Sequence, residues 1–231
     1  MKYSELGRVM LDVQGLTLTA QEREIIAHPQ VGGLILFSRN FDNAQQLTEL
    51  NRQIRECKKN ILIAVDHEGG RVQRFRTDFT RIPSMRSLAQ KAPHLLTDTA
   101  QLMAQELLAT GIDFTFAPVL DRFNAASTVI GDRAFSESPQ AIVHHANQFI
   151  NGLTAQGMAA VGKHFPGHGG VDGDTHLTSA QDLRELAEIT LSDLIPFTQL
   201  AAKLHGIMPA HVVFPCVCER PVGFSARWLQ T

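Results

Sequence analysis

The residues of this chain that are best suited to chemistry lie in one stretch of the sequence. Lys163 and His164 directly follow an apolar run, and Asp174 and His176 come a few positions later in a glycine-containing loop. A carboxylate beside an imidazole can fix the tautomer of the ring and raise its basicity, which suits a histidine to proton transfer near neutral pH. Asp174 and His176 are therefore a candidate proton-transfer pair. The alternative is that both are ordinary charges of a solvated loop.

Lys163 and His164 stand at the end of a predicted strand. A buried lysine without a partner is costly, so we expect both side chains to face a polar cleft. Hydrogen bonding to a polyhydroxylated or anionic ligand would use them there. The structural alternative is an internal ion pair, for instance between Lys163 and Asp121. We expect His168, which lies inside a Pro-Gly-His-Gly sequence, to shape or pack its loop.

A second group of charged residues, 66–74, follows another apolar run and places two carboxylates and two arginines around a Gly-Gly turn. Asp66 is the first residue after the predicted strand and is expected to point into the site. Glu68, Arg71 and Arg74 could form a charge network that holds the loop, and this interpretation fits Arg71 best. The double glycine lacks the spacing of a phosphate-binding loop, so phosphate is not the predicted ligand.

The elements that must position these residues alternate regularly along the chain. Short apolar runs are separated by segments with helical periodicity, and several of those segments end at a glycine. Alternation of this kind predicts a parallel sheet with right-handed crossovers, either doubly wound or closed as a (β/α)8 barrel. The predicted strands cover residues 9–13, 33–37, 61–65, 114–118, 159–163 and 206–210.

Polar residues at the strand ends distinguish between the two folds. An open sheet would concentrate them at one switch point, whereas a barrel carries its site residues along the whole C-terminal face. The sequence therefore predicts an α/β fold of the TIM (β/α)8 type. A complete barrel needs eight strands, so we expect 1–231 to form a single barrel domain that is truncated after about six βα units. The polar residues are Asp12, Arg39, Asn40, Asp66, Glu68, Asp121, Lys163, His164 and His211.

Composition excludes several classes of partner. A net charge of −2 provides no basic face for nucleic acid or for an anionic membrane surface. The N-terminus lacks the apolar core of a secretory signal, and no apolar run approaches the ~20 residues that span a bilayer. We therefore expect a cytoplasmic protein that contacts neither nucleic acid nor membrane.

The three cysteines, Cys57, Cys216 and Cys218, are expected to be reduced thiols. Cys216 and Cys218 form a Cys-x-Cys pair that could bind a metal with His211, but structural zinc usually takes four ligands at tighter spacings. No metal and no other cofactor is expected.

The segment 163–169, together with Asp174-Thr175-His176, resembles the signature of the bacterial NagZ-type β-N-acetylglucosaminidases of glycoside hydrolase family 3. The likeness extends in the family's order through essentially the whole chain. It implies a cytosolic enzyme that removes terminal β-linked N-acetylglucosamine from anhydro-muropeptides, a small saccharide substrate, during peptidoglycan recycling. The other matching segments are 10–13, 32–37, 66–74, 116–121, 130–133 and 208–211.

The resemblance also implies roles for individual residues. His176 matches the family's acid/base histidine, and Asp174 matches the carboxylate that orients it. A histidine in this role is neutral or cationic, so it does not repel an anionic nucleophile as a second carboxylate would. His67 stands where many relatives have glutamine. The positions that match the family's sugar-binding residues are Asp66, Arg74, Arg133, Lys163 and His164.

One part of the family's machinery has no counterpart in this sequence. The family's nucleophile is an aspartate in a Phe-Ser-Asp-Asp-type motif after the seventh strand, and no residue in 1–231 matches it. We therefore expect these residues alone to be inactive as a retaining glycosidase, which needs both groups. A non-catalytic sugar-binding fragment, an N-acetylglucosaminide phosphorylase and a metal-dependent barrel hydrolase remain as alternatives. A monomer is the expected form.

Overall fold

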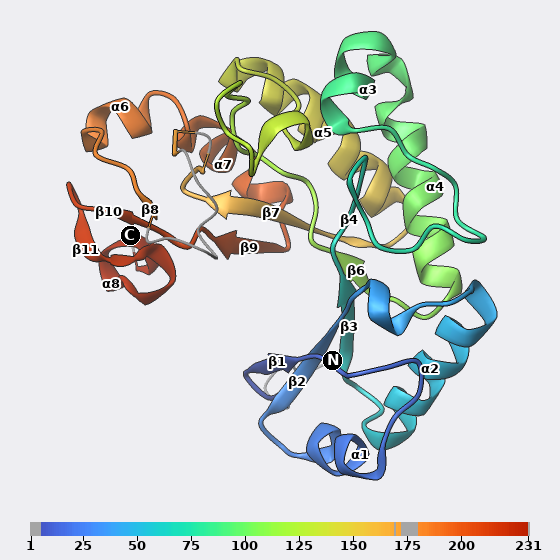
Figure 1. Ribbon diagram of the computed structural model, residues 1–231. Coiled ribbons are helices and arrows are strands. Elements are labelled where there is room, and N and C mark those ends of the chain that lie inside the picture. The colour runs from blue at the N-terminus through green and yellow to red at the C-terminus, as the bar shows by residue number, and fades with distance from the viewer. Residues whose placement is uncertain (1–5, 169, 172–179, 231) are drawn as a thin grey trace.

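The computed structural model describes residues 6–168, 170–171 and 180–230, which form a mixed α/β fold around one curled sheet (Figure 1). The sheet has six strands, all parallel to their neighbours. Their spatial order follows the sequence, with β1 and β9 at the two edges. The bounds are β1 Val9–Leu11, β2 Val31–Leu36, β3 Leu62–Val65, β6 Phe114–Thr115, β7 Ala159–Phe165 and β9 Gly206–Pro209.

This sheet confirms the fold class that was predicted from the sequence. Each of the six predicted apolar runs overlaps one of its strands. Figure 1 shows the sheet turning from β1 and β2 through β3 to β7 and β9, so that it forms a half-barrel. The architecture is that of six consecutive strands of a TIM-type barrel.

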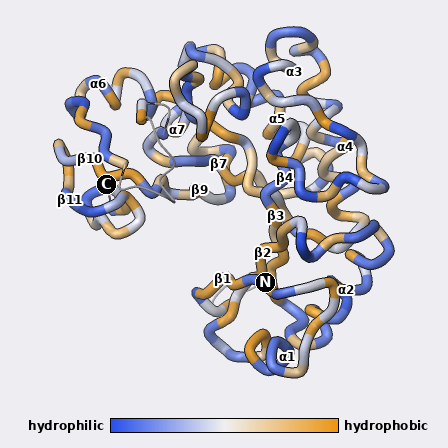
Figure 2. Tube along the Cα trace, in the orientation of Figure 1, coloured by the Kyte–Doolittle hydropathy of each residue, from blue (hydrophilic) through white to orange (hydrophobic). Residues whose placement is uncertain are grey.

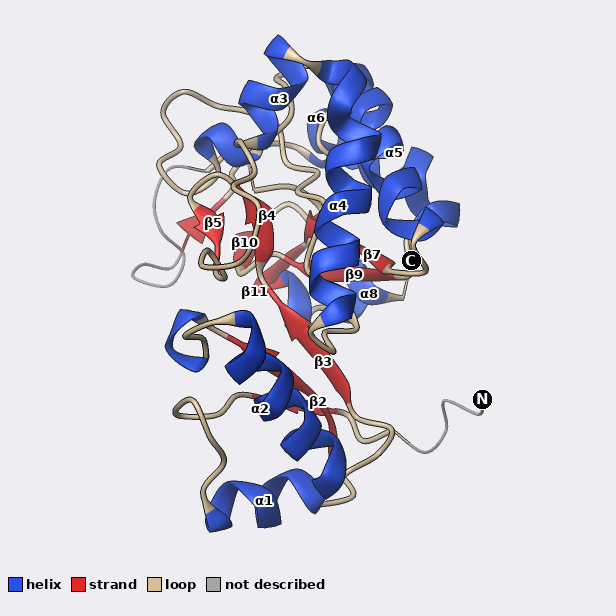
Figure 3. Ribbon diagram, turned by 90° about the vertical axis from the view of Figure 1, so that its right-hand side faces the viewer, coloured by secondary structure: helices blue, strands red, loops and turns tan. Residues whose placement is uncertain are grey.

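Helices cover the outer face of the half-barrel. Figure 3 shows α2 lying over β2 and β3, and α4 beside α5 over the later strands. The bounds are α1 Ala20–Ala27, α2 Ala44–Cys57, α3 Met85–Lys91, α4 Leu96–Ala109, α5 Pro139–Ala155, α6 Leu186–Thr190, α7 Leu194–Leu200 and α8 Ala226–Leu229.

Local sequence explains where the helices begin and which face they bury. Asn43 precedes α2, and its side chain accepts a hydrogen bond from the backbone NH of Gln46, which satisfies one of the free donors of the first turn. Leu47, Leu50 and Ile54 recur at helical spacing and are completely buried against the sheet. The spacing of apolar residues that predicted this helix is thus the spacing of the residues that it buries.

Two small sheets lie outside the half-barrel and were not predicted. The first is an antiparallel hairpin of β4 (His67–Gly69) and β5 (Val72–Gln73), directly after β3. The second joins β8 (Ala180–Gln181), β10 (Val212–Phe214) and β11 (Cys218–Pro221). The sequence prediction relied on apolar runs, and charged or amide side chains interrupt β4, β5, β8 and β11.

The apolar side chains form one main core and a smaller one. The main core fills the space between the sheet and its helices, and Figure 2 shows β2 and β3 there as mostly hydrophobic. The smaller core lies under the three-stranded sheet and contains Val171, Ala180, Phe214 and Trp228. Val171 and Ala180 thus pack into the same core from the two sides of the segment 172–179.

Three further findings concern the described residues. None of their helices has the length and apolar character needed to cross a membrane. Cys57, Cys216 and Cys218 are free thiols. No three side chains of His, Cys, Asp or Glu in the described part of the chain come together as a metal site.

Candidate active site

A cavity of about 580 Å³ opens at the carboxyl ends of the strands. All five residues that were predicted to bind sugar line it, which the barrel geometry anticipates because parallel strands end at one face. Asp174 and His176 lie outside the described residues. The cavity is lined by Phe37, Asp66, Arg71, Val72, Arg74, Thr128, Val129, Arg133, Lys163, His164, His168, Met208, Pro209 and His211.

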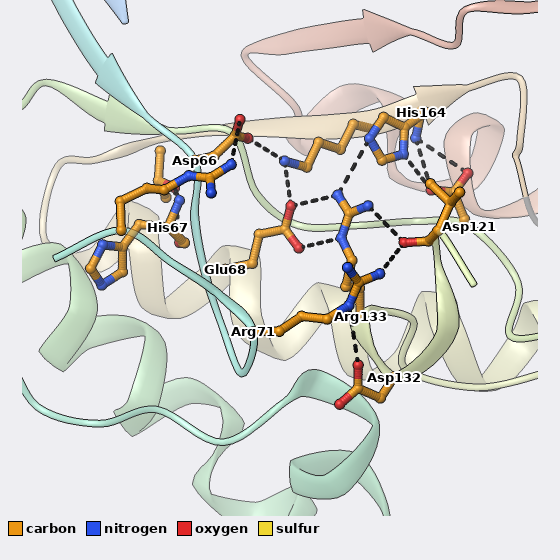
Figure 4. Close-up of polar contacts among 12 residues, drawn as sticks. Asp66, His67, Glu68, Arg71, Asp121, Asp132, Arg133 and His164 are labelled. Carbon is orange, nitrogen blue, oxygen red and sulfur yellow. Dashed lines mark hydrogen bonds and ion pairs between the residues drawn. The ribbon is translucent and has the colours of Figure 1, made fainter. Parts of the chain in front are cut away.

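A cluster of ion pairs connects three residues that line this cavity, Asp66, Arg133 and Lys163, through the buried Glu68 (Figure 4). Glu68 accepts two hydrogen bonds from Arg133, at 2.8 Å from Nε and 2.7 Å from Nη2. The Nζ atom of Lys163 lies 2.5 Å from Glu68 Oε1 and 2.6 Å from Asp66 Oδ1. We refer to Asp66, Glu68, Arg133 and Lys163 as the cavity cluster.

Pairing is what allows Lys163 to be buried. Its side chain is 2% exposed, and an ammonium group at that depth needs charged partners to offset its desolvation. The sequence left open an internal ion pair of Lys163 with Asp121. The lysine does form internal ion pairs, but with Asp66 and Glu68, while Asp121 bonds to His164.

Glu68 was expected at a strand end and in a loop-holding charge network, but not among the sugar-binding residues, and the structure places it at the centre of the cluster. Burial opposes ionisation of Glu68, but Lys163 and Arg133 outweigh burial and lower its pKa to about 2. Conversely, Glu68 outweighs the effect of burial on Arg133 and raises the arginine's pKa. The sequence did contain an indication that Glu68 points toward the site. Glu68 is two residues from Asp66, and in extended chain every second side chain points to the same side. Figure 4 shows His67, the residue between them, pointing away from the cluster.

Asp66 and Arg74 retain hydrogen-bonding capacity toward the cavity. Asp66 Oδ1 accepts from Lys163, while its Oδ2 lies 4.0 Å from Arg74 Nη2. Both side chains line the cavity and are partly exposed, at 21% for Asp66 and 33% for Arg74. A ligand oxygen in the cavity can therefore accept a hydrogen bond from the guanidinium group of Arg74.

His164 is held in one orientation by Asp121. The Nδ1 atom of His164 lies 2.6 Å from Asp121 Oδ2, and the backbone NH of His168 donates to Asp121 Oδ1 at 2.7 Å. Burial opposes ionisation of Asp121, but His164 and then His168 outweigh it and lower the pKa of this carboxyl. With Nδ1 donating to Asp121, the lone pair of the neutral ring is on Nε2, 3.5 Å from Arg133 Nη2.

The remaining charged residues of the two loops hold the walls of the cavity. Arg71 donates to the backbone oxygens of Thr128 and Val129 and lies 3.8 Å from Asp132, so it ties the β4–β5 hairpin to the loop before Arg133. Arg71 also lines the cavity, and its bonds are those of a loop-holding residue.

His168 is 3% exposed and packs at the edge of the His164 ring, with 5.9 Å between ring centroids. Burial lowers the pKa of His168. The sequence analysis expected this histidine to shape or pack its loop, and the contacts fit that role.

Three of the predicted strand-end residues, unlike Glu68 and Asp121, neither line the cavity nor pair with a charged residue that lines it. Asp12 and Arg39 pair with each other near the surface, and Asn40 is buried, where it donates to the carbonyl oxygens of Val13 and Gly15. Their expected place among the site groups was therefore wrong. Position at a strand end brings a residue to the correct face of the sheet, but the following loop decides where its side chain points.

Comparison with known proteins gives consistent results. The family model "Glycosyl hydrolase family 3 N terminal domain" matches residues 2–231. A "Beta-hexosaminidase" of Pseudomonas aeruginosa is 50% identical over 226 residues, covering 97% of this chain and 68% of the relative. A "Beta-hexosaminidase" of Tolumonas auensis is 53% identical over 231 residues, covering 97% and 69%.

Solved structures agree with these sequence matches. NagZ from Neisseria gonorrhoeae, in complex with N-trifluoroacetyl-D-glucosamine, superimposes with a TM-score of 0.94 at 43% identity, covering 98% of this chain and 70% of that one. A family 3 β-N-acetylglucosaminidase from a Paenibacillus species gives a TM-score of 0.91 at 30% identity, covering 96% and 44%.

Proposed function

The chain belongs to glycosyl hydrolase family 3, and we propose that it provides the sugar-binding and acid/base part of an exo-acting β-N-acetylglucosaminidase. Relatives at about half identity are named beta-hexosaminidases, and a structural neighbour holds an N-acylated glucosamine. The natural substrate in this proposal is a terminal β-linked N-acetylglucosamine on an anhydro-muropeptide. The protein acts as a monomer in the cytoplasm, in peptidoglycan recycling, and residues 1–231 form a single barrel domain.

The observation that carries the proposal is that polar side chains which can hydrogen-bond a ligand line the cavity. Saccharide hydroxyls are both donors and acceptors, and Asp66 supplies an acceptor beside the donors of Arg74 and Lys163. The cavity of about 580 Å³ lies within the range of small-ligand sites. Arg133 and His164 complete the proposed sugar-binding set. Both oxygens of Glu68 already bond to Arg133, so Glu68 does not bind the sugar in this proposal. Its negative charge balances the positive charges of Arg133 and Lys163.

His176 and Asp174 supply the proton transfer in this proposal. His176 protonates the glycosidic oxygen as the bond to the anomeric carbon breaks, while a carboxylate attacks that carbon from the opposite face and forms a glycosyl-enzyme. The same histidine, oriented by Asp174, then takes a proton from the water that releases the sugar. No residue in 1–231 matches the family's nucleophile, so in this mechanism the attacking aspartate comes from outside these residues.

The first experiment replaces His176 by alanine in the protein at its natural length. With a chromogenic β-N-acetylglucosaminide, kcat should fall about 10²- to 10⁴-fold, the usual contribution of a positioned acid/base group. Calorimetric titration with N-acetylglucosamine should give a nearly unchanged Kd. Asp66→Ala is the matched variant, which should lose sugar binding. Unchanged turnover in His176→Ala would remove this histidine from the mechanism.

A parallel assay uses the purified 231-residue chain. It should not turn over the chromogenic substrate, because no nucleophile is present to form the glycosyl-enzyme. Robust turnover would contradict that part of the proposal and leave the sugar-binding assignment in place. Running the natural-length enzyme in phosphate and in an inert buffer separates hydrolysis from phosphorolysis, since only a phosphorylase gains rate from phosphate.

A further inference from the structure

A second group of charged residues lies beside the loop that follows β7. Arg184 donates from Nε to Asp182 Oδ1 at 2.9 Å, from Nη2 to Asp182 Oδ2 at 2.6 Å, and from Nη1 to Asp193 Oδ2 at 2.8 Å. The side chains of both aspartates are 2% exposed and that of Arg184 is 21% exposed. We refer to Asp182, Arg184 and Asp193 as the Arg184 network.

The Arg184 network lies outside the proposed sugar-binding cavity. None of its members is among the residues that line that cavity, and Arg184 and Asp193 border a separate cavity of about 400 Å³. All three guanidinium nitrogens already donate to carboxylates. Any influence of this network on the reaction is therefore indirect.

The network presses closely against the start of the loop after β7. A β-carbon added to Gly170 would lie 2.3 Å from Arg184 Nη2 and 2.6 Å from Cζ, and one added to Gly167 would lie 2.6 Å from Asp193 Cβ. Only glycine permits such an approach, and Gly167 also has a φ of +144°. Arg184 cannot easily move aside, because two carboxylates hold it.

The same network is attached to the far side of segment 172–179. Asp182 follows β8 directly, and its backbone NH donates to Val213 O at 2.9 Å. Arg184 therefore connects residues that precede the segment with residues that follow it. Both sides are fixed independently as well, because Val171 and Ala180 are buried in the smaller core. Asp174 and His176 lie in the sequence between these two fixed points.

We propose that Arg184 and Asp193 are positioning residues for the proton-transfer pair, acting through the backbone on both sides of segment 172–179. The proposal rests on the function proposed above, in which His176 carries the proton. A displacement of about 1 Å at a reacting group can cost roughly 100-fold in rate. Fixing the backbone on both sides of the pair thus contributes to the rate in addition to the identity of the pair.

The test compares Arg184→Ala with Arg55→Ala in the natural-length enzyme. Arg55 is a matched control, because its side chain is 34% exposed, pairs with Asp113 at 2.8 Å and donates to two backbone oxygens. It lies at the other end of the strands, near Ile61 and Gly111. Two substrates are used, one whose leaving group needs a proton and one whose acidic leaving group, a dinitrophenolate, departs without one.

For Arg184→Ala we expect kcat to fall about 100-fold on the substrate that needs a proton, with little change in KM. The fall should be much smaller with the dinitrophenyl substrate, and Arg184→Ala should add little when His176 is already alanine. Arg184→Lys keeps the charge but loses the planar fork, so it should restore only part of the rate. Arg55→Ala should leave both kcat values unchanged.

A second variant guards against a failure of Arg184→Ala to fold. Gly170→Ala adds one methyl group against the guanidinium and keeps every charge, whereas Gly15→Ala meets nothing within 4 Å and is its control. Gly170→Ala should show the same dependence on the leaving group. Equal losses on both substrates, or a rise in KM alone, would overturn the positioning role. Normal turnover in His176→Ala would instead overturn the proposed function, and the two failures are therefore distinguishable.

Discussion

The cavity cluster and the Arg184 network are built from the same kinds of residue but differ in how far their side chains are exposed. In the Arg184 network each guanidinium nitrogen donates to an aspartate, and both aspartates are 2% exposed. In the cavity cluster Glu68 is buried and bonded in a similar way, yet Asp66 and the neighbouring Arg74 are 21% and 33% exposed and line a cavity of about 580 Å³. An ion pair that is completely buried holds a fold, whereas one with exposed polar atoms beside a cavity can also bind a ligand.

The largest expected effect is on stability, from Glu68→Ala. This change leaves Lys163 and Arg133, whose side chains are 2% and 12% exposed, with a single remaining carboxylate, Asp66, in the cluster. Removing one partner of a buried ion pair costs about 3–5 kcal/mol. Urea denaturation at pH 7 should show this loss in the free energy of unfolding. A loss no greater than that of an exposed ion pair would mean that the cluster is hydrated in solution.

The second prediction concerns acid. The pKa of Glu68 is about 2 in the folded protein, below its usual 4.5. A depressed carboxyl pKa contributes stability that is complete above pH 4.5 and is lost as the pH falls toward 2, a total on the order of 3 kcal/mol. Unfolding free energies measured by urea denaturation between pH 5 and pH 3 should fall steeply. A flat profile over that range would contradict the charge assignment of the cluster.

His67 provides the control for this acid profile. Burial, and to a lesser degree the neighbouring Arg74, lowers the pKa of His67 from 6.5 to about 4. The folded state thus favours neutral His67, so this contribution to stability is complete above pH 6.5 and is lost as the pH falls to 4. In His67→Gln the free energy of unfolding should therefore change less between pH 6.5 and pH 5. It should still fall at lower pH, because that fall comes from protonation of Glu68.

A smaller effect is expected from Asp193→Ala in the Arg184 network. The change removes one hydrogen bond of Arg184, worth about 1.5–3 kcal/mol for a charged pair, while Asp182 still pairs with the arginine. The Kd for N-acetylglucosamine should not change, since Asp193 does not line the sugar cavity. Loss of sugar binding in a folded Asp193→Ala protein would erase the distinction between the two groups.

The smallest effect is expected from Arg52→Ala on α2. Arg52 pairs with Glu49 and Glu56 on the exposed face of the helix, where all three side chains are about half exposed to water. Exposed pairs of this kind contribute little because water screens them. The urea midpoint should stay unchanged, which calibrates the larger effects above. A clear decrease would show that ion pairs stabilise this protein regardless of burial.

The sequence predicted the strands well and the side-chain directions less well. All six strands of the half-barrel, though not those of the two small sheets, came from apolar runs, because a buried parallel strand must be apolar on both faces. Asp12, Arg39 and Asn40 were expected at the site from their place after strands, but they bond to each other or to nearby backbone. The direction of a loop side chain depends on contacts that the strand pattern does not encode.

The sequence by itself determined the alternation of strands and helices, and with it the face on which the charged residues gather. It also contains the motif around Asp174 and His176 on which the proposed chemistry depends. Only the tertiary structure decided which charges pair. Lys163 and Asp66 are 97 positions apart, and Glu68 and Arg133 are 65 apart. Ion pairing falls off with distance and depends on burial, and both are set by the curl of the sheet, which brings the ends of β3 and β7 together.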